Sequence, residues 1–469
     1  MRSIASLPGP AGLPVLGNIF QIRLPKLHRQ LEQWAGQFGP FFKLKIGRYP
    51  TLVVADHAVV AQVLRERPES FKRSSHMERI AGEMGLKPGV FGASGDDWKR
   101  QRRMVMASFD PTHVRDYFPS LQMTAERLHR RWQVAAREGR AIELQPDLMR
   151  YTVDTIAGLA FGAEVNTLES DGDVIQQHLD KIFPALFKRI ISPWPVWRVF
   201  PTAGGRQLVR SVAEVNEAVD AFVAQARARM QADPKLRTRP RNLLEAMIAA
   251  ADQPDSGISD EQVAGNVMTM LLAGEGTPAN TIAWMIDLLW RNPEALARAR
   301  KEVRGLLGES SARPSLEQVG QLEYLEACAH ETMRLKPVAP MIGLEALHDT
   351  EIEDVRVPRG AIVLALMRHD SVSEKHLGDA ARFMPERWLE GAAEAGQPKR
   401  ISMPFGAGPR FCPGRYLALL EIKMAMAMLL DRFDIRSVDT PDGRPADERM
   451  SFTMAPVGLR MRLDERAAA

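Results

Sequence analysis

The most informative stretch of this chain is Phe405-Gly406-Ala407-Gly408-Pro409-Arg410-Phe411-Cys412-Pro413-Gly414. Its two glycines, one residue apart, indicate a tight backbone turn. The lone Cys412 follows, directly before a periodic segment at 415–433 that predicts a helix. A cysteine at a helix N-terminus lies near free N–H groups and partial positive charge, which favour its thiolate. The alternative is a buried structural cysteine, but the complete pattern favours a soft, electron-rich metal ligand.

This pattern resembles the haem-binding signature of the cytochrome P-450 superfamily. The signature requires Phe, Gly, Arg, Cys and Gly at fixed spacing, and the chain meets every term with Phe405, Gly408, Arg410, Cys412 and Gly414. The resemblance implies haem b (iron protoporphyrin IX) as cofactor, with Cys412 as the axial iron ligand. It also implies that Arg410 pairs with a haem propionate and Phe405 packs beside the sulfur. Gly406 belongs to the same cofactor loop, and Gly414 lets the last helix approach the porphyrin.

Two further motifs lie upstream in the order that the superfamily shows. Glu331 and Arg334 are three residues apart on a predicted helix at 324–335, so they share a face. The segment at 383–388 resembles the motif that follows, and its Arg387 completes a buried network with them. The resemblance gives this network a structural role in holding the haem-side core.

Trp98 and Arg102 are four residues apart, which places them on one face of a helix. The superfamily uses such a pair to hold a haem propionate. The adjacent cations Lys99, Arg100 and Arg103 form either a solvated helix face or a docking surface for an acidic electron-donor protein, and we slightly favour docking.

The longest predicted helix spans Asp260–Arg291 and contains Ala273-Gly274-Glu275-Gly276-Thr277-Pro278. This stretch resembles the oxygen-binding pattern of the superfamily. The resemblance implies that Ala273 and Gly274 lie at the cofactor, with Gly274 letting the helix pass close over it. Thr277 would supply a hydroxyl that orders water and relays protons. Pro278 lacks an N–H, so the helix is expected to kink there and admit water.

The chain departs from this pattern at Gly276, where the superfamily normally has an acid. The nearest carboxylate is Glu275, rotated by about 100° around the helix. Our hypothesis is that protons arrive through Glu275 or through water admitted by the gap at Gly276. A second departure is Leu344-Glu345-Ala346, which offers no cation for the second propionate, and we do not expect His348 to replace it. The other histidines are scattered, without metal-ligand spacing.

Several apolar segments are expected to form the substrate pocket by analogy, and they fit a lipophilic substrate bound mainly by burial. The alternative for any single residue is an ordinary place in the core. The aromatic segment at 190–201 is read as a lid over the access channel, or else as a surface that rests on a membrane. The pocket candidates are Met77, Phe91, Leu272, Val338, Met341 and Met454.

The 469 residues contain no linker or repeat, so we expect one domain, residues 1–469. Within it lie a Pro-rich segment at 1–24, the central distal helix at 260–291, and the cysteine loop with its proximal helix at 405–433. The periodicities predict a mainly α fold with small β-sheets, including a hairpin at 42–55 and a closing hairpin at 450–463.

The charge pattern argues against nucleic acid, because 62 basic residues interleave with 58 acidic ones for a net charge of only +4. Two cysteines cannot form a disulfide framework, and the prolines of the N-terminal segment do not suit a signal peptide. The apolar stretch at 263–290 contains Glu275 and Asp287, so a buried helix is favoured over a membrane span. We expect a cytoplasmic monomer with no integral membrane segment.

The sequence therefore predicts a haem-thiolate monooxygenase that inserts one oxygen atom from O2 into a lipophilic substrate, by hydroxylation or epoxidation. Electrons are expected from a ferredoxin or flavodoxin-type donor with its reductase, because the chain ends 57 residues after Cys412. The alternatives are a peroxide-driven oxygenase, a redox-neutral haem-thiolate isomerase, and a non-catalytic haem sensor. The retained Thr277 argues against peroxide chemistry, while Gly276 leaves it open.

Overall fold

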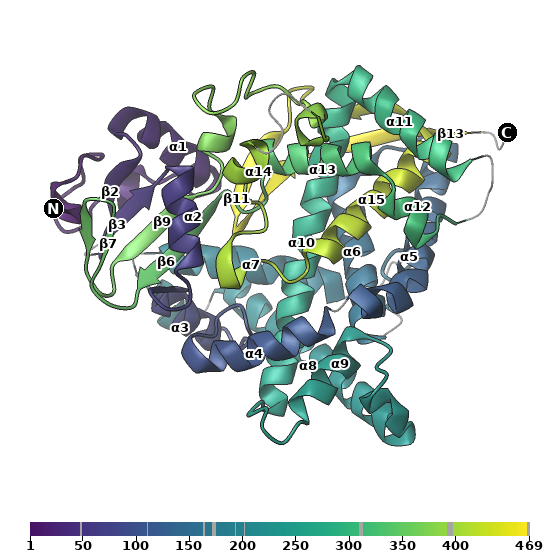
Figure 1. Ribbon diagram of the computed structural model, residues 1–469, viewed down its shortest axis with the longest axis horizontal. Coiled ribbons are helices and arrows are strands. Elements are labelled where there is room, and N and C mark those ends of the chain that lie inside the picture. The colour runs from purple at the N-terminus through teal and green to yellow at the C-terminus, as the bar shows by residue number, and fades with distance from the viewer. Residues whose placement is uncertain are drawn as a thin grey trace.

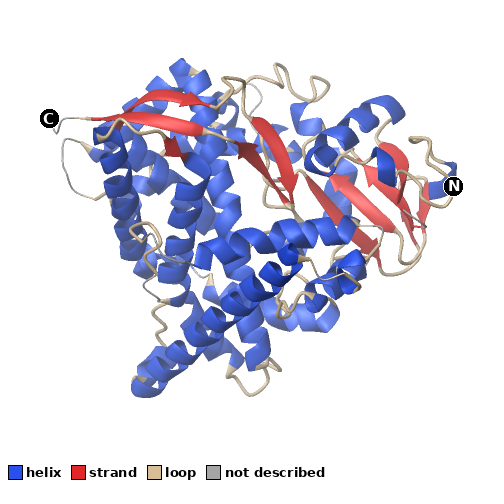
Figure 2. Ribbon diagram, turned by 180° about the vertical axis from the view of Figure 1, so that it is seen from behind, coloured by secondary structure: helices blue, strands red, loops and turns tan. Residues whose placement is uncertain are grey.

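The computed structural model describes residues 1–46, 49–109, 111–162, 165–170, 175–192, 194–200, 202–308, 313–391 and 397–466. Helices dominate, and the long helix α10, Asp260–Arg291, runs through the middle of the molecule (Figure 1). The strands form a band along one side (Figure 2). The expected mainly α fold with small β-sheets is confirmed.

The other helices follow one another along the chain with short connections. They are α1 Leu27–Phe38, α2 His57–Arg65, α3 Ser75–Glu83, α4 Gly95–Ser108, α5 Pro111–Arg137, α6 Leu144–Phe161, α7 Ile175–Ile191, α8 Ala203–Ala232, α9 Leu243–Ala251, α11 Pro293–Leu307, α12 Leu316–Gly320, α13 Glu323–Leu335, α14 Gln397–Ile401 and α15 Arg415–Arg432.

The largest sheet has the strand order β2-β3-β9-β6-β4 and joins the N-terminal hairpin to strands from the second half of the chain. Two smaller sheets have the orders β1-β8-β7 and β10-β13-β5, and β11 pairs with β12 alone. The strands are β1 Arg2–Ser3, β2 Phe41–Ile46, β3 Tyr49–Val54, β4 Phe71–Lys72, β5 Ile142–Glu143, β6 Met341–Ala346, β7 Thr350–Ile352, β8 Val355–Val357, β9 Ile362–Leu366, β10 Phe433–Asp439, β11 Asp447–Ser451, β12 Thr453–Val457 and β13 Arg460–Glu465.

Helix α10 begins at a capping box: Ser259 accepts the backbone N–H of Gln262, and the Gln262 side chain accepts that of Ser259. Its polar residues find partners inside the protein, because Asn266 donates to Gln101 at 2.8 Å and Asp287 pairs with Arg291 at 2.8 Å. No helix among the described residues is long and apolar enough to cross a membrane. The helix is a buried central element, as its internal polar residues predicted.

Most element positions follow from the local patterns, but the closing hairpin was predicted wrongly. β11 and β12 form a hairpin across Phe452, whereas β13 leaves it to pair with β10 and β5. Apolar alternation specifies strands without specifying which strand lies beside which. The first hairpin is present as β2 and β3, although two residues of its turn, 47 and 48, lie outside the described residues.

Candidate cofactor site

The cysteine loop precedes α15 and is closed by a hydrogen bond of 2.9 Å from the Cys412 N–H to the Phe405 carbonyl. Gly406 and Gly408 have φ angles of +74° and +70°, the left-handed conformation that suits glycine. A Cβ on Gly408 would lie 2.5 Å from the Cα of Arg65, the last residue of α2. Gly408 therefore lets the loop pack directly onto the end of α2.

The Cys412 thiol is subject to opposing influences. Burial raises its pKa, while the Gly414 backbone N–H and the charges of Arg102 and Arg415 act to lower it. Burial prevails, so the helix N-terminus alone does not hold the thiolate that the sequence suggested. A coordinated cation deprotonates a thiol outright, so a thiolate here calls for a metal. A Cβ on Gly414 would lie 3.9 Å from Sγ and from the Phe109 ring, so Gly414 borders the thiol directly.

Trp98 and Arg102, both on α4, meet the cysteine loop from the other side. The Arg410 guanidinium lies over the Trp98 ring, with Cζ 4.6 Å from the ring centroid, and donates to the Ala93 carbonyl at 2.6 Å. Arg102 donates to the Phe411 carbonyl at 2.8 Å. The structure thus brings Trp98, Arg102, Arg410 and Cys412 together from two segments about 310 residues apart in sequence.

Two further cations approach Arg410, and the sequence reasoning missed both. Burial and the charge of Arg410 lower the pKa of Arg67 to about 10. Burial, followed by the charges of Arg67 and Arg410, lowers the pKa of Arg73 to about 9. Burial also lowers the pKa of Arg410 to about 10, and its Nε has no hydrogen-bond partner. Since an arginine stays protonated at neutral pH, these cations repel one another until anions join them.

This group fits the two propionates of a haem, whose anionic oxygens would supply the missing partners. No carboxylate is paired with Arg67, Arg73, Arg102 or Arg410 among the salt bridges of the described residues. Strand β6 supplies no cation, as the sequence predicted: Glu345 accepts from the Ser75 N–H and hydroxyl at 2.7 and 2.9 Å. Neither Arg67 nor Arg73 lies in a motif, so nothing in the sequence signalled that they would approach Arg410.

Helix α10 is buried for most of its length, yet it exposes Ala273 and leaves Gly276 and Thr277 half-buried. The Thr277 hydroxyl donates to the Ala273 carbonyl at 2.7 Å. An accessible patch in the middle of a buried helix marks a space beside it, which suits the oxygen side of a cofactor. Gly274 faces α6 and not the exposed patch, because a Cβ added at this position would lie 3.3 Å from Ile156 of α6. The close approach that Gly274 permits is therefore between α10 and α6.

Glu275 also points away from the exposed patch. Its carboxyl group is buried and lies close to that of Asp180 on α7, and each of the two has one oxygen without a hydrogen-bond partner. Burial, then the negative charge of Asp180 and the hydrogen bond to it, raises the pKa of Glu275 well above its usual value. Glu275 therefore lies on the side of α10 that faces α7, away from the place of the usual acid at Gly276. Its rotation around α10 from Gly276 is the physical reason.

The second network lies where α13 meets the 3-10 helix η7, Pro385–Trp388. Arg334 binds both oxygens of Glu331, at 2.8 and 2.7 Å, and both side chains are fully buried. Arg387 approaches Glu331 at 3.6 Å, while the Trp388 ring N–H donates to it at 2.9 Å. The structure brings together the three residues that the sequence assigned to this network.

The pocket candidates separate into two groups. Phe91 keeps accessible surface, as do Val338 and Met341, whereas Met77 and Leu272 are buried with 9% and 5% exposure. Met454 is fully buried, and its sulfur accepts a hydrogen bond from Arg368 at 3.7 Å. Met454 therefore belongs to the core and does not line an open pocket.

An aromatic cluster near Phe91 was not predicted. Phe452, in the β11–β12 turn, stacks on Phe183 of α7 with centroids 4.4 Å apart, and it lies 6.1 Å from Phe91. All three rings keep some accessible surface. Only the tertiary structure joins these distant positions, so sequence periodicity gives no signal for them. Within the expected lid, Trp194 and Phe200 are 53% and 68% exposed, and residues 193 and 201 lie outside the described residues.

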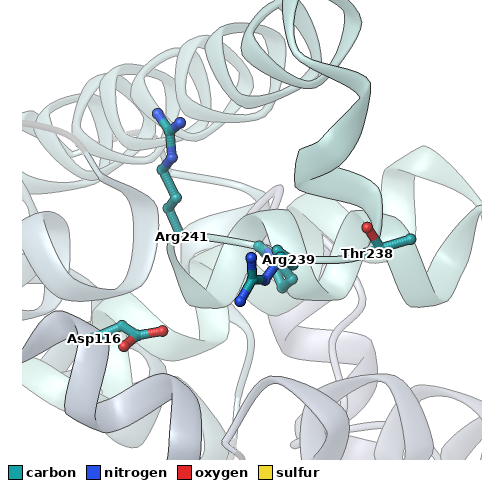
Figure 3. A pocket seen from close by; sticks show the side chains of 5 residues that line it. Asp116, Thr238, Arg239 and Arg241 are labelled. Atoms are coloured by element: carbon teal, nitrogen blue, oxygen red, sulfur yellow. The ribbon is translucent and has the colours of Figure 1, made fainter.

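The cationic face of α4 is partly neutralised. Lys99 lies 3.6 Å from both Glu69 and Asp96, and Arg100 lies 3.5 Å from Asp97. A hollow of about 600 Å³ opens here beside Trp98, Arg102 and Arg103. A second hollow of about 450 Å³ lies by Asp116 and the loop at 238–241 (Figure 3). The second contains none of the motif residues, so it is separate from the cofactor site.

Comparison with known proteins assigns the chain to a family. Residues 7–463 match the family model described as Cytochrome P450. The chain is 26% identical to protein lutein deficient 5 of Arabidopsis thaliana, covering 90% of this chain and 71% of that protein. It is 27% identical to cytochrome P450 2D9 of Mus musculus, covering 93% and 87%.

A self-sufficient cytochrome P450 monooxygenase of Phanerodontia chrysosporium is 29% identical over 96% of this chain. The chain spans only 42% of the length of that relative.

Proposed function

The chain belongs to the cytochrome P450 family, and from this premise we propose that it is a haem-thiolate monooxygenase whose iron is held by the Cys412 sulfur. The observation that carries the proposal is a thiol close to a group of four arginines that form no salt bridge with a carboxylate among the described residues, although the charge of Glu78 acts on Arg410. Haem b needs a protein ligand for its iron and cations for its two propionates. The thiol can supply the first and the arginines the second. When bound, the haem activates O2 with electrons supplied from outside, and its thiolate ligand favours O–O cleavage.

The propionates are assigned to the arginine group. Arg410 and Arg102 are held by backbone carbonyls, and Arg410 also by the face of Trp98, so their orientation exists before the anions arrive. Arg73 lies over the Phe91 ring with its Cζ 4.2 Å from the centroid. Arg67 and Arg73 take the place of the cation that β6 lacks. Binding two anions here would relieve the repulsion among buried cations, which favours cofactor retention.

The substrate is proposed to be a lipophilic organic molecule, because the accessible rings of Phe91, Phe183 and Phe452 offer an apolar surface near the cofactor site. Aromatic rings bind chiefly by burying area and by stacking, and they exclude water from the reacting groups. Thr453 borders both the aromatic cluster and the α10 patch, since a Cβ on Gly276 would lie 3.9 Å from its hydroxyl. The substrate would therefore lie between the aromatic cluster and Ala273.

The proton path is proposed to run through the gap at Gly276. Gly276 and Thr277 share the accessible patch of α10, whereas Glu275 is committed to Asp180 on the buried side. Water at Gly276 would pass a proton to Thr277 Oγ, which donates its own proton onward after releasing the Ala273 carbonyl. Asn280 borders the same gap at 3.8 Å and is oriented by Gln145 at 2.9 Å.

Electrons are proposed to come from a separate ferredoxin or flavodoxin-type protein with its reductase. The charged face of α4 beside Trp98 and Arg102 is the candidate docking surface, and its cations Lys99 and Arg100 are only partly neutralised. The expected cytoplasmic location and monomeric state remain predictions. The expected single domain over residues 1–469 is likewise kept as a proposal.

The test is turnover under 18O2 with a donor, a reductase and a panel of lipophilic compounds that shift the haem absorption. One 18O atom in the product supports the proposal. Oxygen derived only from water, or product formed without reductant, contradicts it. Peroxide-driven oxygenation is the second candidate, because Gly276 removes the usual acid; product formed at full rate from H2O2 without donor proteins would favour it.

A further inference from the structure

Three histidines surround one buried aspartate on the side of the molecule that carries the large sheet. His57 is the first residue of α2, and Asp370 begins the 3-10 helix η6, Asp370–Val372, after β9. His376 follows in the next loop, and His369 precedes the aspartate. Among the described residues, His57, Asp370 and His376 are the one group of three whose metal-binding atoms all lie within 4.8 Å of one another. We call these three residues the Asp370 cluster.

The ring nitrogens of the cluster converge on a single oxygen. His57 Nδ1 lies 2.9 Å from Asp370 Oδ2, and His376 Nε2 lies 3.4 Å from the same atom. The two imidazole rings meet edge to face with centroids 4.9 Å apart. The aspartate side chain is 8% exposed, while the two histidine side chains are 23% and 18% exposed. The carboxylate is fixed inside the protein, and the imidazoles reach it from the solvent side.

Helix capping does not account for this arrangement. Asp56 already caps α2, because its Oδ1 accepts the N–H groups of Ala58 and Val59 at 2.9 and 3.0 Å. Asp370 Oδ2 receives the His57 N–H at 2.9 Å in addition to both rings. Three nitrogen atoms thus crowd around one oxygen, while His369 Nδ1 contacts the other oxygen. The crowding suits atoms that face a shared ion.

We propose that His57, Asp370 and His376 form a binding site for a divalent transition-metal ion of the Zn²⁺ type. Two imidazoles and a carboxylate are ligands that zinc prefers, with a fourth position left for water. Tetrahedral coordination at metal–ligand distances of about 2.0–2.1 Å places ligand atoms about 3.4 Å apart. The separations from Asp370 Oδ2 are 2.9 and 3.4 Å, close to this value, so small rotations of the His57 and His376 rings would close the site.

The surroundings supply the support that metal sites require. His369 Nδ1 lies 2.9 Å from Asp370 Oδ1, the oxygen that the cluster leaves free. The His57 backbone N–H holds Oδ2 from the helix side. Such outer contacts orient a carboxylate and commonly contribute tenfold or more to metal affinity. Burial acts to raise the pKa of the Asp370 carboxyl, but hydrogen bonds from His369 and His57 outweigh it and lower the pKa below its usual value.

The position of the site suggests what the ion does. α2 begins at the cluster and ends at Arg65, whose Cα borders Gly408 of the cysteine loop. The residue after Asp370, Ser371, accepts a hydrogen bond from Arg334 of the buried Glu331 network. An ion at His57 would therefore fix α2 against the core that supports the cysteine loop. The proposed role is structural, and it is independent of the reaction that the cofactor carries out.

The test uses the haem-loaded protein without a histidine tag, after chelation and dialysis. Zn²⁺ is titrated by calorimetry, and bound zinc is counted by elemental analysis. We expect one equivalent in the wild type and in His348→Gln, whose exposed ring contacts only the Asp349 carbonyl. His57→Gln and His376→Gln should bind at least about tenfold more weakly. Affinity should also fall as the pH falls below about 6.5, because protonated imidazole cannot bind a metal.

Thermal unfolding provides a second readout that separates binding from misfolding. The same Zn²⁺ concentration should raise the Tm of the wild type and of His348→Gln, and raise the Tm of His376→Gln clearly less. The haem spectrum of each variant shows that it has folded. Equal zinc affinity in the wild type and both ligand variants overturns the proposal, as does the absence of binding below about 1 mM Zn²⁺. Either result leaves the proposed monooxygenase function untouched, because that function is measured by 18O2 incorporation.

Discussion

The guanidinium of Arg410 lies over the ring of Trp98, with its Cζ 4.6 Å from the centroid, and its Nε has no hydrogen-bond partner. One residue comes from the cysteine loop and the other from α4. Arg410 is half-buried, and a cation held there by a ring face and one carbonyl is positioned without being neutralised. This relationship identifies an anion site beside Cys412, and it connects the thiol to the propionates of the proposed cofactor.

The first prediction concerns Arg73. Arg73→Met should lower haem affinity by about tenfold to a hundredfold, because a charge-assisted hydrogen bond to a propionate is lost. Transfer of haem to an acceptor protein measures this loss. In the haem-free protein the same substitution should leave stability unchanged or raise it, since it removes repulsion from Arg67 and Arg410.

Arg103→Met is the control, because Arg103 is exposed on α4. A loss of haem in the control as fast as in Arg73→Met would assign the effect to the removal of positive charge in general and not to the position of Arg73. Unchanged haem transfer in Arg73→Met would remove Arg73 from the cofactor site.

The second prediction concerns the gap at Gly276. A Cβ at this position would meet no atom closer than 3.8 Å, so a side chain can begin here without a clash at its first atom. Gly276→Asp should increase the fraction of reductant recovered as product, because it restores an acid beside Thr277. Gly276→Asn has the same shape without the acid and should show no gain. Equal coupling in the two variants would exclude a proton path through this gap.

The third prediction concerns Thr277. Its hydroxyl already bonds to the Ala273 carbonyl, so Thr277→Ala removes a proton donor while the helix keeps its backbone bonds. Reductant consumption should continue and more of it should end as peroxide. Thr281→Ala is the matched control, because Thr281 makes the same bond to the carbonyl four residues back, at 2.8 Å. Product yield that stays at the wild-type level in Thr277→Ala would contradict the proposed role.

The fourth prediction concerns pH and Glu275. Burial and the nearby Asp180 raise its pKa in the folded protein, so the folded state binds a proton that the unfolded state releases above about pH 4.3. Stability from this group is therefore present at low pH and declines as pH rises toward the folded pKa. In Glu275→Gln the side-chain amide can still donate to Asp180, but it does not titrate, so its contribution to stability does not decline as the pH rises. Its stability relative to wild type should increase between pH 5 and pH 8 in denaturant titrations, and a constant difference would contradict the assignment.

The fifth prediction concerns the Glu331 network. Glu331→Gln leaves the fully buried Arg334 without a charge partner, and breaking such a pair costs about 3–5 kcal/mol. Urea unfolding of the haem-loaded protein measures the loss. Glu386→Gln is the control, because Glu386 contacts Tyr324 and Arg298 near the surface. If both variants lost a similar free energy of unfolding, the buried network would contribute no more to stability than a surface contact.

The sequence predicted those parts of the site that short patterns encode. The cysteine loop, α10 and the Glu331–Arg334 pair each lie within a few residues, and their spacing follows from helix and turn geometry. The orientation of Glu275 was less accessible, because its partner Asp180 lies on another helix. Arg73, the aromatic cluster and the Asp370 cluster were missed for the same reason: their members meet only after the chain has folded.

The central claim is that the Cys412 sulfur binds the haem iron, and the absorption spectrum of the reduced, carbon-monoxide-bound protein tests it most directly. The account predicts the band position characteristic of a thiolate ligand in the wild type. Cys412→His should retain haem and shift that band to the position of a histidine-ligated haem. A wild-type band at the histidine position, or a thiolate band that persists in Cys412→His, would contradict the claim.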